Sequence, residues 1–206
     1  PISSSISNSA TCSRRSSTAR CGQDDMHIDW FRQEIVFKIV YYGPGLGGKT
    51  TNLEYLHAHL DPALRSRLVV LKSPEERTLY FDFFELALGA IKGKKPRFHL
   101  YTIPGQLYYA SSRKIVLRGV DAIVFVADSQ SARRQDNLDS LMDLELKLIE
   151  QGKTLAQFPW VLQYNKRDLT EIDSVDEMEQ SLNFLRVPHY GPSLSRASPS
   201  SKPCAA

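Results

Sequence analysis

The sequence predicts an α/β fold, in which a mostly parallel sheet carries helices on both of its faces. Apolar runs typical of strands alternate along the chain with segments of helical periodicity, and this order favours a parallel sheet. The strand runs are nearly continuously apolar, as expected for strands that are buried on both faces. A glycine-rich loop at residues 43–48 joins the first long strand to the first helix.

Strands are expected where short runs are rich in β-branched and aromatic residues. They cover residues 34–42, 78–88, 97–102, 121–127 and 160–164, with a short one at 68–71. Gly89, Gly93 and Pro96 lie between the two aromatic-rich strands, 78–88 and 97–102, so these two are expected to form a hairpin.

Helices are expected over residues 50–60 and 131–151, and another begins after Ser174. Asp61 and Pro62 end the first helix. Ser174 and Glu177 have the spacing of a capping box, which satisfies backbone N–H groups at the start of the third. In the second helix, five apolar residues recur at helical spacing and are expected to form one face: Leu138, Leu141, Met142, Leu148 and Ile149.

One domain is expected at residues 26–190, between two disordered tails. The chain has 206 residues, of which 42% are hydrophobic, and this is enough for one core. Residues 1–25 are rich in Ser and lack an apolar face, and residues 191–206 are rich in Pro and Ser. Met26 is the expected natural start, which makes residues 1–25 upstream sequence.

Composition argues against several classes of function. The net charge of +3, from 26 basic and 23 acidic residues, is too balanced to favour binding to nucleic acid or to a membrane surface. The apolar runs are too short to span a bilayer, so no stable membrane insertion is expected. The three cysteines, Cys12, Cys21 and Cys204, lie in the tails, which argues against a disulfide framework, a cysteine metal site or a catalytic thiol.

The strongest motif is a phosphate-binding loop. Residues 43–50 match the pattern G-x-x-x-x-G-K-[ST] between an expected strand and an expected helix, which is the context that the motif requires. The backbone N–H groups of the loop and the helix N-terminus favour phosphate; the lysine reaches the β- and γ-phosphates, and Thr50 can ligate Mg²⁺. The expected phosphate-binding residues are Gly43, Gly45, Leu46, Gly47, Gly48, Lys49, Thr50 and Thr51. The alternative is a glycine-rich turn with a surface lysine.

A second motif points to guanine. Asn165, Lys166 and Asp168 form the pattern N-K-x-D directly after the strand at 160–164. The carboxylate of Asp168 offers two acceptor oxygens, which suit the N1–H and 2-amino donors of guanine. Adenine lacks this pair of donors. Alone, this four-residue match would also fit a polar loop, but after a phosphate loop and at a strand end it is more specific.

A third motif, Thr102-Ile103-Pro104-Gly105-Gln106, completes a resemblance to the small Ras-like GTPases, which are P-loop NTPases with a G domain. Their third motif is usually Asp-x-x-Gly-Gln. The resemblance implies that the Gly105 N–H senses the γ-phosphate and that Gln106 orients the attacking water. Here Thr102 replaces the aspartate, so the carboxylate that helps to hold Mg²⁺ through water is missing.

Further segments, at residues 41–46, 77–83, 98–106 and 124–130, resemble the MglA family of bacterial gliding-motility and polarity GTPases. The resemblance covers roughly residues 30–190. It implies a cytoplasmic switch that binds GTP and GDP with Mg²⁺, hydrolyses GTP slowly, and acts in cell polarity and gliding. It also implies a dimeric roadblock/LC7-type partner of the MglB kind that stimulates hydrolysis.

The same resemblance assigns two residues of the first switch loop. Thr78 matches the threonine that ligates Mg²⁺ in the GTP state, alongside Thr50. Arg77 matches an arginine that acts in cis as an arginine finger, which in related enzymes is worth about 10³–10⁵ in rate. The alternative for Arg77 is a solvated arginine that pairs with Glu75 or Glu76.

The family pattern continues to Tyr190 and then gives way to the Pro/Ser-rich tail. The final strand and helix are therefore expected to be missing, through a frameshift or through divergence. Two functions stay open. The first is an active GTPase switch, favoured by Gln106, Arg77 and Thr78. The second is a nucleotide-binding interaction module with little or no hydrolysis, favoured by Thr102 and the missing end.

Overall fold

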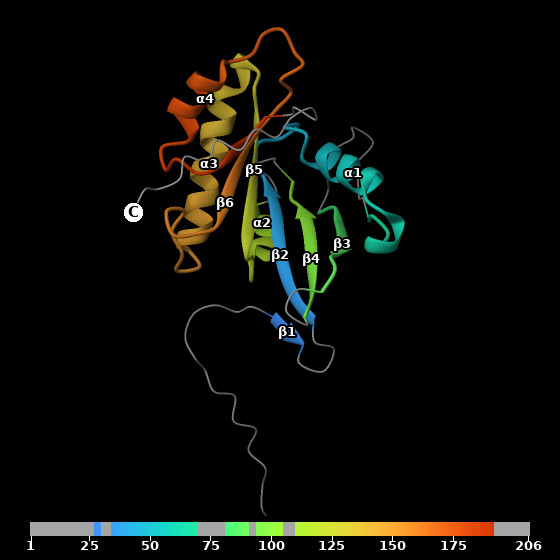
Figure 1. Ribbon diagram of the computed structural model, residues 1–206. Helices are drawn as coiled ribbons and strands as arrows, with labels where there is room; N and C mark the ends of the chain where they lie inside the picture. Colours follow the sequence, from blue (N-terminus) through green and yellow to red (C-terminus); the bar gives the residue numbers. More distant parts are fainter. Residues whose placement is uncertain (1–26, 30–33, 70–80, 91–93, 105–109, 192–206) are drawn as a thin grey trace, which may run out of the picture.

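The strands of the chain form a single twisted sheet (Figure 1). The computed structural model describes residues 27–29, 34–69, 81–90, 94–104 and 110–191. The strands of the sheet follow the spatial order β3-β4-β2-β5-β6-β7, with β1 paired to the start of β2. The strands are β1 (His27–Asp29), β2 (Glu34–Tyr42), β3 (Phe83–Ala87), β4 (Lys95–Thr102), β5 (Ala122–Asp128), β6 (Trp160–Asn165) and β7 (His189–Tyr190).

The sheet is parallel from β4 to β7, and only β3 and β1 run antiparallel to their neighbours. β2 pairs in parallel with both β4 and β5, so Tyr41 lies between Thr102 and Val124. β5 and β6, and then β6 and β7, also pair in parallel. β3 pairs antiparallel with β4, which confirms the expected hairpin, and β1 pairs antiparallel with β2. The prediction of a mostly parallel sheet is therefore confirmed.

Helices cover both faces of this sheet, as the sequence predicted. They are α1 (Lys49–His59), α2 (Ala110–Leu117), α3 (Arg134–Ile149) and α4 (Val175–Leu182), with 3₁₀ turns at Pro62–Leu64 and Ser131–Arg133. Side chains alternate between the faces along β2: Val40 and Tyr42 pack in the larger core, while Ile39 and Tyr41 contact the smaller one. The smaller core contains Leu53 of α1, and the larger core contains residues of α2, α3 and α4.

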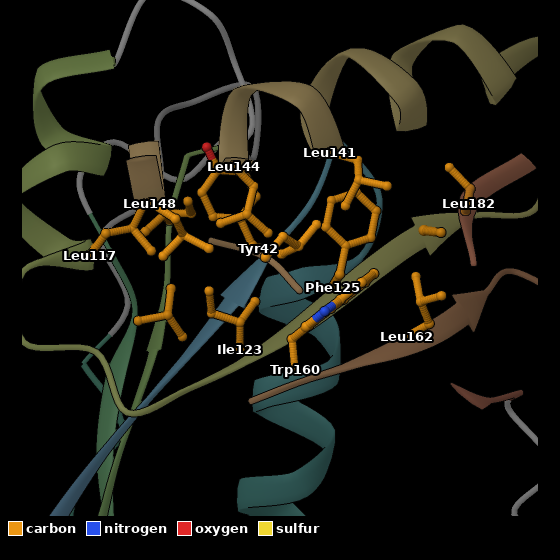
Figure 2. Packing of buried hydrophobic residues seen from close by; sticks show 14 of the residues in the cluster. Tyr42, Leu117, Ile123, Phe125, Leu141, Leu144, Leu148, Trp160, Leu162 and Leu182 are labelled. Atoms are coloured by element: carbon orange, nitrogen blue, oxygen red, sulfur yellow. The ribbon is translucent and has the colours of Figure 1, made fainter. Parts of the chain in front are cut away.

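Figure 2 shows how α3 closes the larger core: its leucines point toward the aromatic rings of the central strands. Leu144 and Leu148 are fully buried in this cluster, where Tyr42 and Phe125 also lie. The buried face differs from the predicted one, because Met142 is 63% exposed and Ile149 is 53% exposed. Residues 141, 144 and 148 share one stripe of the helix, and Met142 is rotated away from it by about 100°.

Most element boundaries agree with the sequence-based ones to within a few residues. The expected strand at 78–88 is observed as β3 (Phe83–Ala87), and residues 78–80 lie outside the described part of the chain. Of the short strand expected at 68–71, residues 70 and 71 lie outside the described part of the chain, and Val69 forms an isolated bridge with Phe83. The capping box of α4 is confirmed, since Ser174 and Glu177 bond each other's backbone N–H groups.

The expected loss of the final strand is corrected in part. β7 is a two-residue strand, in which His189 and Tyr190 lie beside Leu162 and Gln163 of β6. Its approach is fixed by a hydrogen bond from the Leu162 N–H to the Pro188 carbonyl (3.0 Å). No helix follows β7 within the described residues, which extend to position 191. In the same described ranges, no helix has the length and apolar character that a membrane span needs.

Candidate nucleotide-binding site

The glycine-rich loop lies at the carboxyl end of β2 and leads directly into α1 (Figure 1). Gly43 has φ = 140°, and a Cβ added there would lie 2.2 Å from the carbonyl oxygen of Val126 on β5. Gly48 has φ = 92°, and its added Cβ would lie 2.2 Å from Nδ2 of Asn165. Both positions therefore need glycine for two reasons, the left-handed backbone and the closeness of a neighbour.

Lys49 is the first residue of α1 and is buried beneath the loop. Its Nζ donates to the carbonyl oxygens of Gly43 (2.9 Å) and Pro44 (2.6 Å). Burial lowers the pKa of Lys49 to about 7, repulsion from Arg113 acts in the same direction, and attraction to Asp82 opposes both. The ammonium group thus lies inside the phosphate loop, in an environment that disfavours its charge until an anion arrives.

Thr50 follows on the first turn of α1, and its hydroxyl donates a hydrogen bond to Oδ2 of Asp82. The same carboxylate oxygen accepts a hydrogen bond from the Thr102 hydroxyl at 2.6 Å. Thr102, the residue that replaces the usual aspartate, is fully buried at the end of β4. The structure thus places a carboxylate beside Thr50 from a different position in the chain.

None of the sequence motifs indicated a role for Asp82. It immediately precedes β3 and is fully buried. The available signal was an acidic residue inside the aromatic run Phe81-Asp82-Phe83, since a buried carboxylate needs polar partners.

The guanine motif lies at the carboxyl end of β6, next to the phosphate loop. Asn165 donates from Nδ2 to the carbonyl oxygen of Gly47 (2.8 Å) and so joins the two loops. Lys166 has φ = 59° and donates to Oδ2 of the buried Asp128 (2.7 Å). Asp168 lies in the following turn and is exposed. It directly follows the segment that Asn165 joins to Gly47 and that Lys166 joins to Asp128.

Asp128, at the end of β5, caps the loop that follows, because its Oδ1 accepts from the Gln130 N–H (3.1 Å). Arg133 adds a contact that the sequence did not signal: its Nη2 donates to the Gly45 carbonyl at 2.7 Å. At the outer end of the loop, Leu46 has φ = 62° and is 61% exposed. Thr51 is also exposed, on the first turn of α1.

Four of the predicted residues lie outside the described part of the chain. They are Arg77 and Thr78 of the first switch loop and Gly105 and Gln106 of the third motif. Their assigned roles therefore remain predictions. The described residues fit a phosphate chain with Mg²⁺, because they combine a loop with glycine where a Cβ would clash, a buried lysine at a helix N-terminus, and a threonine hydroxyl beside a carboxylate.

The depressed pKa of Lys49 predicts a pH-dependent affinity for GDP. Bound phosphates favour the charged ammonium and raise this pKa, so binding takes up a proton above pH 7 and none below it. The dissociation constant should be level below pH 7 and then rise with pH, by at most about tenfold per unit. Fluorescent-GDP titrations between about pH 6 and 8.5 measure it.

The control for this profile is Lys49→Arg, whose guanidinium stays charged across the range. Its affinity is expected to be weaker and its pH profile level above pH 7. A wild-type profile that is level between about pH 7 and 8.5 would contradict the argument.

Comparisons with known proteins agree with this geometry. Residues 27–198 match the ADP-ribosylation factor family. The chain is 51% identical over 163 residues to the "Mutual gliding-motility protein MglA" of Myxococcus xanthus (strain DK1622), covering 79% of this chain and 84% of the relative. The chain therefore belongs to the ADP-ribosylation factor family of small GTPases, which bind GTP and GDP with Mg²⁺ and hydrolyse GTP.

Proposed function

We propose that this chain is the GTP-dependent switch of a bacterial motility and polarity system. Its role would match that of its relative, the gliding-motility protein MglA. The single observation that carries the chemical part is the hydrogen bond from Asn165 to the Gly47 carbonyl (2.8 Å). It holds the predicted guanine loop against the predicted phosphate loop, so one nucleotide can contact both. The biological part is supported by the 51% identity with the gliding-motility protein.

In this proposal the phosphates are bound by the backbone N–H groups of residues 43 and 45–50 and by the Lys49 side chain. The Lys49 ammonium uses two of its three N–H donors on the carbonyl oxygens of Gly43 and Pro44, which leaves one donor for a phosphate oxygen. Thr50 and Thr78 would hold Mg²⁺, which neutralises charge on the β- and γ-phosphates.

Hydrolysis is assigned to residues of the two switch segments. Gln106 orients the attacking water, and the N–H of Gly105 bonds the γ-phosphate. Arg77 stabilises the charge that develops on the phosphates as their bond breaks. These roles are carried over from the family pattern at matching positions.

The proposed partner is a dimeric roadblock-type protein of the MglB kind that stimulates hydrolysis, and the proposed compartment is the cytoplasm. Both rest on the family resemblance and on the identity with MglA. The proposed domain is residues 26–190, and the described elements from β1 to β7 fall within it.

The second candidate function is a nucleotide-binding module with little turnover. The observation that favours it is Thr102, which brings no charge to the position of the usual aspartate. The two candidates differ in one measurable quantity, the rate of GTP hydrolysis with the partner present.

The proposal is tested by titrating the chain with fluorescent GDP, GTP, ADP and ATP in the presence of Mg²⁺. Selective binding of the guanine nucleotides, followed by partner-stimulated hydrolysis, is the expected result. Selective binding without hydrolysis would favour the module. A chain that is folded by circular dichroism and binds no guanine nucleotide would contradict both.

Arg77→Ala gives a sharper test of the switch. It should retain affinity for GTP and lose about 10³–10⁵-fold in partner-stimulated turnover, because the arginine acts only as charge develops. Single-turnover hydrolysis with saturating partner measures the loss. Arg67→Ala removes an exposed arginine from the same connecting region and serves as the matched control, with turnover near that of the wild type. Unchanged turnover in Arg77→Ala would exclude the arginine-finger role.

A further inference from the structure

We propose that Asp82 supplies the carboxylate of the Mg²⁺ site. It would do the work of the aspartate that other small GTPases have at the position of Thr102. This inference rests on the proposed nucleotide-dependent function and specifies one residue of its metal site. Asp82 would act through Thr50 and through metal-bound water, and is therefore a positioning residue for the ion.

Thr102 holds Asp82 in place through three hydrogen bonds. The Asp82 N–H donates to the Thr102 hydroxyl oxygen (3.0 Å), and that hydroxyl donates to Oδ2 of Asp82 (2.6 Å). The Thr102 N–H donates to the Asp82 carbonyl oxygen (2.9 Å). Both residues are fully buried, so this arrangement is shielded from water. Thr102 therefore has a clear structural role as the support of a carboxylate.

The carboxylate in turn orients the expected metal ligand. The Thr50 hydroxyl donates its proton to Oδ2 of Asp82, the same oxygen that accepts from Thr102. A hydroxyl that donates to a carboxylate keeps its lone pairs for a cation, and such outer partners fix the orientation of metal ligands. The negative charge also lies close enough to Lys49 to raise the pKa of that ammonium group, so it belongs to the electrostatics of the phosphate loop.

The same geometry explains why position 102 is not an aspartate. A second carboxylate there would be forced against Oδ2 of Asp82, because the Thr102 hydroxyl already lies only 2.6 Å from that oxygen. Two buried carboxylates at such a distance cannot both be ionised without a strong penalty. The chain therefore has one carboxylate at this site, and it comes from the residue before β3 instead of from the end of β4.

The test is the Mg²⁺ dependence of fluorescent-GDP release from the full chain. GDP is chosen because Thr78 is assigned to the GTP state only. In the wild type, release should be slow in Mg²⁺ and fast after chelation. Asp82→Asn should bind GDP in excess Mg²⁺ but shift the Mg²⁺ midpoint about 10–100-fold upward, as is typical when an outer-shell partner is lost. Mn²⁺ titration followed by electron paramagnetic resonance gives a second readout, with the same shift expected.

Two further comparisons isolate the carboxylate. Asp121→Asn removes an acid that accepts from the Lys38 N–H (2.7 Å) on β2, and it should leave the Mg²⁺ midpoint unchanged. The double variant Asp82→Asn with Thr102→Asp returns a carboxylate to the site from β4, and it should restore most of the wild-type midpoint. If Asp82→Asn does not fold, the variants Thr102→Ser and Thr102→Val test the role of Asp82 instead. Thr102→Ser keeps the hydroxyl that bonds Asp82 and should keep the Mg²⁺ midpoint, whereas Thr102→Val lacks it and should shift the midpoint upward.

The outcomes separate this inference from the proposed function. A wild-type chain that binds no guanine nucleotide would contradict the proposed function. A wild-type chain that binds GDP, together with an Asp82→Asn variant of unchanged Mg²⁺ midpoint, would overturn the role of Asp82 alone. Equal midpoints for Thr102→Ser and Thr102→Val would also overturn it.

Discussion

Gly43→Ala is expected to abolish nucleotide binding and to destabilise the fold. The added Cβ would lie 2.2 Å from the Val126 carbonyl oxygen and 3.1 Å from its carbonyl carbon, and these are backbone atoms of the central strand β5. The backbone at φ = 140° is also unfavourable for any residue with a Cβ. Such strain and such overpacking each cost about 1–3 kcal/mol, which is a large part of a domain's stability.

Urea denaturation and fluorescent-GDP titration measure the two effects of this change. Gly89→Ala is the matched control, because no atom lies within 4 Å of its added Cβ. The control should keep wild-type stability and affinity. If Gly43→Ala were as stable as the wild type and bound GDP equally well, the close approach of the loop to β5 would not constrain the site.

Asp168→Asn is expected to change the base that the protein prefers. Two hydrogen bonds to a charged acceptor are worth about 1.5–3 kcal/mol each, so affinity for GDP should fall by at least about 10²-fold. An asparagine side chain presents one acceptor and one donor face, which match the N1–H and the 2-carbonyl of xanthine. Affinity for xanthosine diphosphate should therefore rise.

Competition titrations with guanosine, xanthosine and adenosine diphosphates measure this preference. Asp168 is exposed, so the substitution should leave the free energy of unfolding within about 0.5 kcal/mol of the wild type. Asp176→Asn, at another exposed acid in the first turn of α4, should keep the wild-type preference. An unaltered preference for guanine in Asp168→Asn would remove Asp168 from the base-recognition role.

Elements with a strong local signal could be predicted from the sequence. The strand at 34–42 has the bounds that its apolar run indicates, and the capping box of Ser174 begins α4 as predicted. The phosphate loop could also be predicted, because its glycines, lysine and threonine lie within eight neighbouring residues, 43–50. Each of these signals depends on residues that are close neighbours in sequence.

Features that depend on packing could not be read in the same way. The apolar residues of α3 fit more than one stripe, and only contact with Tyr42 and Phe125 selects the face of Leu144 over that of Met142. The start of β7 depends on pairing with β6, which no local pattern of two residues can indicate.

By itself, the sequence predicted the class of fold from the order of strand and helix patterns along the chain. It predicted the phosphate loop and the guanine motif from short runs of residue types. The tertiary structure decided which carboxylate serves the site. Asp82 lies 32 residues from Thr50 and 20 residues from Thr102, and the pairing of β3, β4 and β2 brings the three together. A contact of this kind depends on strand register across the sheet, which sequence spacing does not specify.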